Sequence, residues 1–236
     1  MLSEEELQKI FAEGCILDGY AARALQERGL NALMGGVKVS ELTVSSSEYY
    51  TEDPINQGFE TRYHSPLSKK RFAFEVPAEL ECRVLGLYRD NKDNECGIAS
   101  LIFNSSCGGR CALLGYEGMN IHYLSSDRVR QLNRIADFVS GEQLPVLPVD
   151  AVQCLTVPRV TAEKVLRSVT FLNPTIGIQK EQEFILRGVP GEISTVEFLV
   201  PAEKAVLLPL HREKGVCKVT LPPLGPWDIG WLKIGN

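Results

Sequence analysis

Hydrophobic residues at the start of the chain recur with the spacing of an α-helix. Leu7 and Phe11 would share one face of this helix, and Gly14 would end it. Ser3 and Glu6 are spaced as a capping box, in which each side chain satisfies a backbone N–H group of the first turn. The pattern therefore predicts a helix that begins after Ser3 and ends before Gly14.

A second helix is expected after a very short apolar run. Residues 15–17 are typical of a strand, and Asp18 and Gly19 then turn the chain into a helix over residues 20–28. The Asp18 carboxylate can accept hydrogen bonds from the free N–H groups of that helix as its N-cap. Helix, strand, turn and helix in this order indicate an α/β arrangement.

From residue 37 onward, apolar and polar positions alternate with the period of a β-strand. Residues 45–58 are polar and are predicted to form a loop. Residues 104–109 end in two glycines, which suit a hairpin turn. An apolar stripe at helical spacing predicts a helix capped by Ser125 or Ser126 and closed by Gly141. The predicted strands are residues 37–44, 72–76, 82–88, 98–103 and 110–116.

The pattern changes after Gly141. Residues 141–161 contain three prolines and no helical period, which predicts a linker that leads into an edge strand. Short apolar runs then follow at intervals of about 8–12 residues, separated by turn residues, as in an antiparallel sandwich. The predicted strands are residues 165–172, 183–187, 195–200, 205–210, 216–221 and 229–234.

Together these patterns predict a chain of the class α/β plus all-β. Residues 1–143 are expected to form a partial, incomplete α/β layer, and residues 144–236 a small antiparallel β-sandwich. Only one helix precedes the first strand, so the sheet would be left with an uncovered edge. We therefore expect the chain to be part of a longer protein and to form a homo-oligomer.

Composition and charge exclude several classes of protein. With 236 residues, 44% of them hydrophobic and 23% charged, the chain resembles a globular protein and not a disordered one. The net charge of −5 argues against nucleic acid as a partner. No apolar run approaches the ~18 residues that span a bilayer, so no membrane partner is expected. The acidic start, Met1 to Glu6, does not fit a secretory signal, which favours the cytoplasm although the compartment is not determined.

Cysteines give little evidence of a metal site or a disulfide framework. The chain has seven, an odd number, and most lie in apolar runs, where a thiol behaves as a small buried hydrophobic group. Cys107 and Cys111 are closely spaced, but a zinc site needs a second pair of ligands, and only His122 lies nearby. We expect buried thiols, no metal and no cofactor.

Three candidate sites carry some chemistry. The turn at Asp18 follows a strand, which is where a nucleophile elbow places its nucleophile. Cys15, however, stands at the start of that strand and not on the bend. The role of helix N-cap therefore explains Asp18 better. His122 follows a strand end, where active sites of α/β proteins form, yet it has no defined partner. Trp227 and Trp231 are four residues apart, so they would share a face if both lay in one strand. If that face is exposed, the two indole rings could stack on sugars; if it is buried, they would belong to the core.

One segment is more specific. Residues 14–29, GCILDGYAARALQERG, followed by Gly35-Gly36-Val37, resemble the trimerisation-type domain of large glycoside hydrolases of the β-galactosidase kind. Residues 108–116 and the Leu144-Pro145 exit into a β-rich tail look like the same region. The likeness is best over residues 14–37 and looser elsewhere. In that family the catalytic carboxylates belong to a barrel domain upstream, which this chain is too short to contain.

The α/β part is also similar to the flavodoxin-like fold of class I glutamine amidotransferases. Those enzymes carry a cysteine on the bend of Gly-x-Cys-x-Gly and a later His-x-Glu. Leu17 stands where that cysteine belongs, and the residues after His122 lack the glutamate. The resemblance therefore implies that amidotransferase chemistry is absent.

These observations lead to three functional hypotheses. The first is a non-catalytic accessory or oligomerisation segment of a glycoside hydrolase, with an upstream catalytic barrel as its partner. The second is a carbohydrate-binding module that uses Trp227 and Trp231. The third is an uncharacterised hydrolase or amidotransferase that uses Cys15 or His122. No catalytic residue is assigned.

Overall fold

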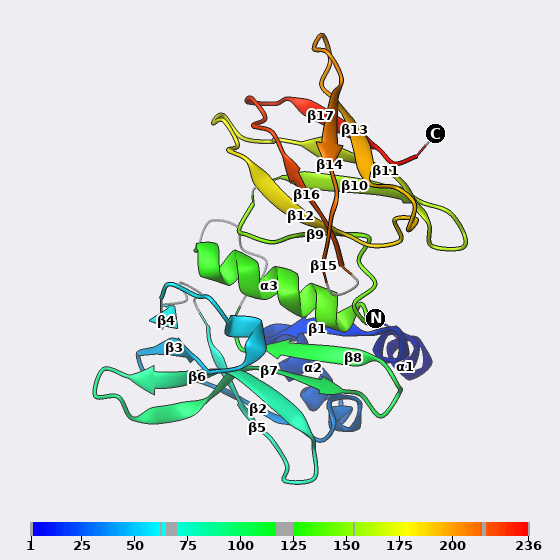
Figure 1. Ribbon diagram of the computed structural model, residues 1–236. Coiled ribbons are helices and arrows are strands. Elements are labelled where there is room, and N and C mark those ends of the chain that lie inside the picture. Colours follow the sequence, from blue (N-terminus) through cyan, green and yellow to red (C-terminus); the bar gives the residue numbers. More distant parts are fainter. Residues whose placement is uncertain are drawn as a thin grey trace. The chain divides into compact units, whose positions relative to one another are not determined.

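The computed structural model describes residues 2–61, 63–64, 70–116, 125–152, 154–213 and 216–235, with only the backbone for 63–64. The chain divides into two compact units, Met1–Glu142 and Gln143–Asn236 (Figure 1). No helix in the described ranges is long and apolar enough to cross a membrane.

The first unit is built on a curled sheet of eight strands (Figure 1). The main order is β1-β8-β7-β6-β3-β4, and β2 and β5 form a branch that joins β7. Among the described strands, only β1 and β8 pair in parallel. The strands are β1 (Cys15–Asp18), β2 (Lys38–Glu41), β3 (Ser46–Tyr50), β4 (Tyr63–His64), β5 (Phe72–Glu75), β6 (Cys82–Asp90), β7 (Glu95–Asn104) and β8 (Arg110–Leu114).

This topology corrects the flavodoxin-like layer predicted for residues 1–143. A doubly wound layer consists of parallel strands joined by crossover helices. Here β6, β7 and β8 follow one another through short turns, and strands joined in this way pair antiparallel. The observed sheet is mixed, with a single parallel pair at its β1 edge. The hairpin predicted at residues 104–109 is confirmed.

The three α-helices begin at the predicted caps. The Ser3 hydroxyl accepts from the N–H of Glu6, and the Glu6 carboxylate accepts from the N–H of Ser3 at 2.7 Å, which completes the capping box. The Asp18 carboxylate accepts from the N–H of Ala21 at 2.8 Å, and Ser125 caps the third helix. The helices are α1 (Glu4–Glu13), α2 (Gly19–Glu27) and α3 (Ser126–Val139), with short 3₁₀ turns η1 (Asn31–Met34) and η2 (Pro54–Asn56).

The helices cover both faces of this sheet, because successive residues of a strand point to opposite sides. On β8, Cys111 and Leu113 pack in the same core as residues of α1 and α2. Ala112 and Leu114 belong to a second core together with Ile135 of α3. Both faces of β8 are therefore buried.

Residues 45–58 do not form the predicted loop. Residues 46–50 form β3, in which Ser46 and Glu48 are buried and their neighbours are more exposed. The alternation is that of a strand, but polar side chains occupy its inward positions. The hydrophobic pattern therefore failed to identify this strand.

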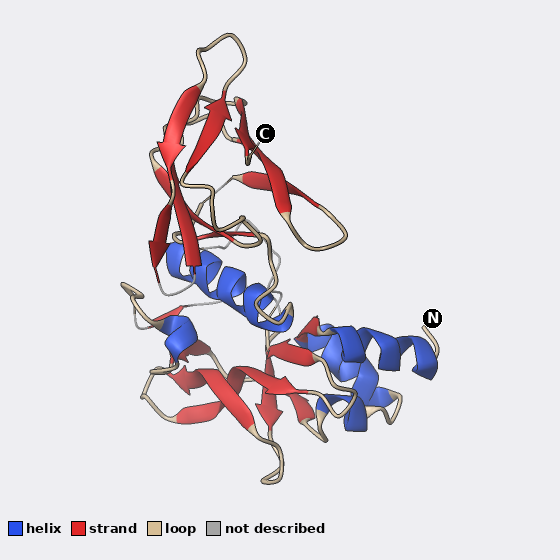
Figure 2. Ribbon diagram, turned by 45° about the vertical axis from the view of Figure 1, so that its right-hand side comes forward, coloured by secondary structure: helices blue, strands red, loops and turns tan. Residues whose placement is uncertain are grey.

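The second unit consists of two antiparallel sheets that share one core (Figure 2). One has the order β10-β11-β17-β13-β14, and the other β15-β16-β12-β9. Phe171 of the first sheet contacts Phe184 of the second, with ring centroids 4.9 Å apart. The strands are β9 (Val146–Pro148), β10 (Leu155–Val160), β11 (Leu166–Leu172), β12 (Gln182–Leu186), β13 (Thr195–Leu199), β14 (Val206–Pro209), β15 (His211–Glu213), β16 (Val216–Leu221) and β17 (Ile229–Lys233).

The antiparallel strands predicted for residues 144–236 are thus confirmed, with one addition. The linker predicted over residues 141–161 contributes β9 and ends in β10, which lies at the edge of its sheet as expected. Pro158 in β10 is compatible with that edge position, because an edge strand can leave one side of its backbone unpaired.

Replacing Gly230 by alanine should destabilise the second unit. A Cβ atom at this position would lie 2.3 Å from Cζ of Phe198, a buried ring in the sandwich core. Overpacking of this kind costs about 1–3 kcal/mol in the free energy of unfolding. Urea unfolding followed by tryptophan fluorescence measures this, because both tryptophans lie in this unit. Gly191→Ala is the control, since no atom lies within 4 Å of its added Cβ; equal losses in the two variants would contradict the packing argument.

Candidate functional site

A charged pair is buried in the core of the first unit. Glu48 of β3 and Arg128 of α3 are 0% and 1% exposed and form an ion pair. The Ser100 hydroxyl donates to the other oxygen of Glu48 at 2.7 Å. Arg128 also donates to the Tyr116 hydroxyl and to the side-chain oxygen of Gln131. Burial alone lowers the pKa of Arg128, but the charge of Glu48, the hydrogen bond to it and the nearby tyrosine hydroxyls together raise that pKa above the usual value, which keeps the guanidinium charged.

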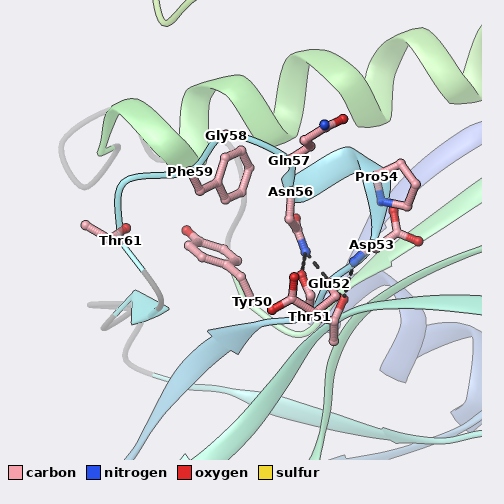
Figure 3. Close-up of a pocket in the computed structure, with 10 residues that line it drawn as sticks. All are labelled: Tyr50, Thr51, Glu52, Asp53, Pro54, Asn56, Gln57, Gly58, Phe59 and Thr61. Carbon is pink, nitrogen blue, oxygen red and sulfur yellow. Dashed lines mark hydrogen bonds between the residues drawn. The ribbon is translucent and has the colours of Figure 1, made fainter.

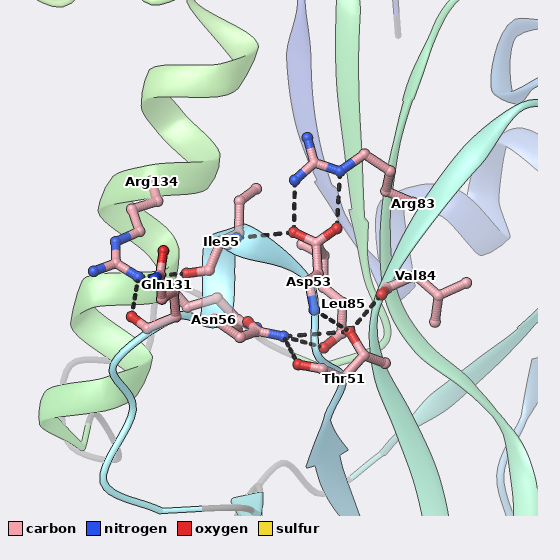
Figure 4. Close-up of polar contacts among 10 residues, drawn as sticks. Thr51, Asp53, Ile55, Asn56, Arg83, Val84, Leu85, Gln131 and Arg134 are labelled. Carbon is pink, nitrogen blue, oxygen red and sulfur yellow. Dashed lines mark hydrogen bonds and ion pairs between the residues drawn. The ribbon is translucent and has the colours of Figure 1, made fainter. Parts of the chain in front are cut away.

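This buried network continues to the chain segment that follows β3. Gln131 donates to the side-chain oxygen of Asn56 at 2.8 Å. The Asn56 amide nitrogen in turn donates to the carbonyl oxygens of Thr51 and Leu85, at 3.0 and 2.8 Å. Asn56 therefore ties η2 to β6 and to α3 (Figure 4).

Side chains from β6 and α3 hold the rest of this segment. Arg83 donates two hydrogen bonds to the Asp53 carboxylate, at 2.6 and 2.8 Å, and the same carboxylate caps η2 through the N–H of Ile55. Arg134 donates to the carbonyl oxygens of Ile55 and Gln57, at 2.8 and 2.7 Å. Figure 4 shows these contacts on opposite sides of the segment.

The end of the segment is fixed by Asp127, a buried residue in the first turn of α3. Its carboxylate accepts from the N–H and hydroxyl of Thr61 at 2.8 and 2.7 Å, and from the N–H of Glu60 at 3.1 Å. Burial by itself raises the pKa of Asp127, but these hydrogen bonds and the charge of Arg130 together hold it below the usual value. The carboxylate is therefore ionised at neutral pH.

The segment of residues 50–61 lines a hollow of about 530 Å³ (Figure 3). Tyr50 and Phe59 form an aromatic pair on one side of it, edge to face, with ring centroids 4.9 Å apart. Glu52 and Gln57 are exposed, and neither side chain forms a hydrogen bond or ion pair with the described part of the chain. The lining residues are Tyr50, Thr51, Glu52, Asp53, Pro54, Asn56, Gln57, Gly58, Phe59 and Thr61.

The described residues that line the hollow offer no pair of free carboxyl groups. Of its two carboxylates, that of Asp53 is engaged by Arg83, which leaves Glu52 alone. Glycoside hydrolysis requires two carboxyl groups facing each other across the bond, about 5–9.5 Å apart. No group of three His, Cys, Asp or Glu side chains within the described ranges could hold a metal ion.

Sequence reasoning did not identify this hollow. Its residues form no catalytic or binding motif, and all of them except Phe59 and Thr61 fall within the loop predicted over residues 45–58. The one available signal was the turn-forming composition of Asp53-Pro54 and Asn56 to Gly58. That signal indicates a turn but says nothing about the side chains that would hold it.

The predicted sugar-binding residues, Trp227 and Trp231, are 62% and 42% exposed and do not belong to the sandwich core. Trp231 lies in β17 beside Thr170 and Leu199 of the neighbouring strands, on the outer face of the five-stranded sheet. Trp227 precedes β17 and has a φ of 61°, so the strand alternation that would place it beside Trp231 does not reach it. Their role in binding stays a prediction.

The outer face of the sheet around Trp231 carries several exposed apolar side chains. Residues directly opposite in antiparallel strands lie on the same face, which places Val157, Thr170, Trp231 and Leu199 in one row across the sheet. A parallel row contains Leu155, Leu172 and Ile229. Exposed apolar rows of this kind mark interaction surfaces.

Of the residues considered for nucleophilic chemistry, only Cys15 lies within the described part of the chain. Cys15 is buried, and its sulfur lies 3.6 Å from that of Cys111. The hydrogen bond with Cys111 and burial both raise the pKa of Cys15, so it remains a thiol and not a reactive thiolate. His122 lies outside the described residues. All seven cysteines are free, and Cys107 is not paired with Cys111.

Comparison with known proteins found a similar solved structure but no matching family model or curated sequence. Among solved structures, the chain is similar to α-L-fucosidase isoenzyme 2 from Paenibacillus thiaminolyticus, with a TM-score of 0.51 and 13% identity. The match covers 85% of this chain and 34% of the fucosidase.

The fold is similar to that of part of an α-L-fucosidase. The chain spans about a third of the length of the fucosidase that it matches, and at 13% identity the likeness concerns the fold alone. The expected resemblance to glycoside hydrolases is thereby supported as a similarity of fold. Its finer parts, the β-galactosidase kind and the trimerisation role, are not addressed by this match.

Breaking the buried pair from one side should destabilise the first unit strongly. Arg128→Met leaves the Glu48 carboxylate buried without its counter-charge, which costs about 3–5 kcal/mol in the free energy of unfolding. Replacing both residues, as Glu48→Leu with Arg128→Met, should recover part of this loss. Urea unfolding followed by tyrosine absorbance is the measurement, because all seven tyrosines lie in this unit.

The control for this experiment is Arg28→Met at the exposed end of α2, for which we expect a change within about 0.5 kcal/mol. A double variant as unstable as the sum of the two single variants would show that the two charges are not energetically coupled.

The contribution of Asp127 should depend on pH. Its pKa is lower in the folded state, so its stabilisation is fully present above the ordinary carboxyl pKa of about 3.9 and is lost as pH falls through the folded value. The difference in unfolding free energy between the unmodified chain and Asp127→Asn should therefore shrink below about pH 4. If the difference in unfolding free energy between the two proteins stays constant throughout the acidic range, the lowered pKa of Asp127 in the folded state is contradicted.

Proposed function

We propose that the chain is a non-catalytic accessory segment that acts together with a glycoside hydrolase catalytic domain, either in the same polypeptide or in a partner chain. The main support is the likeness of 85% of this chain to one third of an α-L-fucosidase. The resemblance of residues 14–37 to the trimerisation-type domain of β-galactosidase-like enzymes favours a role in domain packing or oligomerisation.

Three carboxylates of the first unit are held by structural contacts, which supports the non-catalytic part of this proposal. Glu48 is paired with Arg128 and Asp53 with Arg83, and Asp127 accepts a hydrogen bond from the backbone of Thr61. A glycosidase needs one carboxyl group free to donate a proton and another free to attack or to activate water. Each of these three groups would have to abandon a structural contact in order to do so.

A second candidate function is carbohydrate binding by the second unit. Exposure of Trp227 and Trp231 favours it, because an exposed indole can stack on the C–H face of a sugar ring. In this role the unit would hold a glycan substrate near a catalytic domain.

The accessory role predicts that the purified chain does not hydrolyse glycosides by itself. We expect no release of nitrophenol from nitrophenyl α-L-fucoside or β-D-galactoside above the rate in buffer, because the free carboxyl pair is absent from the candidate site. The control is Glu52→Gln, which removes the one uncommitted carboxylate of the hollow. Turnover by the unmodified chain that Glu52→Gln abolishes would overturn the proposal.

A further inference from the structure

We propose that the hollow enclosed by residues 50–61 binds a neutral pyranose, such as the end residue of an oligosaccharide. This inference deepens the proposed accessory role, because it gives the first unit a ligand of the kind that a glycoside hydrolase acts on. All residues that line the hollow belong to the first unit, whereas both tryptophans belong to the second.

The shape of the hollow is set before any ligand arrives. Arg134 and Asp127 of α3 bind backbone groups of the segment, Arg83 of β6 binds Asp53, and Asn56 binds the carbonyl oxygens of Thr51 in the segment and of Leu85 in β6. A surface segment held by this many side chains loses little conformational entropy when it binds. Preorganisation of this kind raises affinity for a small ligand.

The aromatic pair provides an apolar surface for a sugar ring. The guanidinium of Arg134 lies 5.7 Å from the ring centroid of Phe59, and that of Arg128 lies 5.3 Å from that of Tyr50. These contacts, together with the edge-to-face contact between the two rings, fix their orientation. Figure 3 shows both rings on the same side of the hollow. Burial raises the pKa of Tyr50, so its hydroxyl is neutral at physiological pH.

The remaining polar groups match a ligand with several hydroxyl groups. The Glu52 carboxylate can accept two hydrogen bonds, and the Gln57 amide can both donate and accept. Neither has a partner among the described residues, so neither must break a contact in order to bind. A carboxylate and an amide beside an aromatic surface can recognise the alternating C–H and O–H groups of a pyranose.

The charges of the hollow disfavour other small ligands. Glu52 lines it with an unpaired carboxylate, so an anion such as phosphate would meet repulsion. Asp53 is neutralised by Arg83, which leaves a single carboxylate and too few ligands for a divalent cation. Its volume of about 530 Å³ lies within the usual range of small-ligand sites, about 300–1,000 Å³.

The test uses the full chain and ¹H–¹⁵N NMR titration with L-fucose, D-galactose and D-glucose in turn. We expect at least one sugar to shift the amide signals of residues 50–61 with a millimolar dissociation constant. Glu52→Ala and Gln57→Ala should each weaken this binding about threefold to tenfold, the loss expected for one hydrogen bond. Glu203→Ala, an exposed glutamate of the second unit, is the matched control and should bind as the unmodified chain does.

Trp231→Ala separates the two candidate sugar sites. It should leave the sugar-dependent shifts of residues 50–61 unchanged, whereas any sugar-dependent change in tryptophan fluorescence reports binding at the second unit, which contains both tryptophans. The proposal is overturned if no sugar shifts residues 50–61, if Trp231→Ala abolishes binding while the variants of the hollow do not, or if sodium phosphate shifts these residues as strongly as a sugar does. Each of these results leaves the accessory role intact, whereas hydrolysis by the chain alone would remove that role without testing the hollow.

Discussion

The arrangement of the first unit depends on the ion pair between Glu48 and Arg128. Removing both charges from water is costly, and only close pairing together with further hydrogen bonds offsets that cost. Glu48 comes from β3, Arg128 from the first turn of α3, and Ser100, which also binds Glu48, from β7. The pair is satisfied only when these three elements are correctly placed, which couples the position of α3 to the sheet beneath it.

The position of α3 then determines the candidate site. Asp127, Gln131 and Arg134 follow one another at spacings of four and three residues, so their side chains leave the helix on the same face. All three bind the segment between Thr51 and Thr61, and they do so through different groups: backbone N–H, a side-chain amide and backbone carbonyls. One helix face therefore fixes the shape of the hollow, and the buried pair fixes that helix.

Local signals in the sequence predicted the parts of the fold that local chemistry determines. Ser3 with Glu6, and Asp18, begin their helices as expected, because a cap needs only nearby backbone groups. The β7–β8 hairpin follows for the same reason. β3 was missed because Ser46 and Glu48 are buried polar residues, and only their distant partners make their burial favourable. The hollow was missed because Arg83 and Arg134, which hold it, lie far from it in the sequence.

The parallel pairing of β1 with β8 has a consequence for the synthesis of this protein. Cys15 pairs with Cys111, 96 residues further along the chain, so β1 has no strand partner until β8 has left the ribosome. At about 5–20 residues per second, this takes roughly 5–20 s. During that time β1 is an unpaired strand whose apolar side chains lack their core, a state that favours aggregation. The caps of the two helices beside β1 need only nearby residues, so they favour these helices even before β8 arrives.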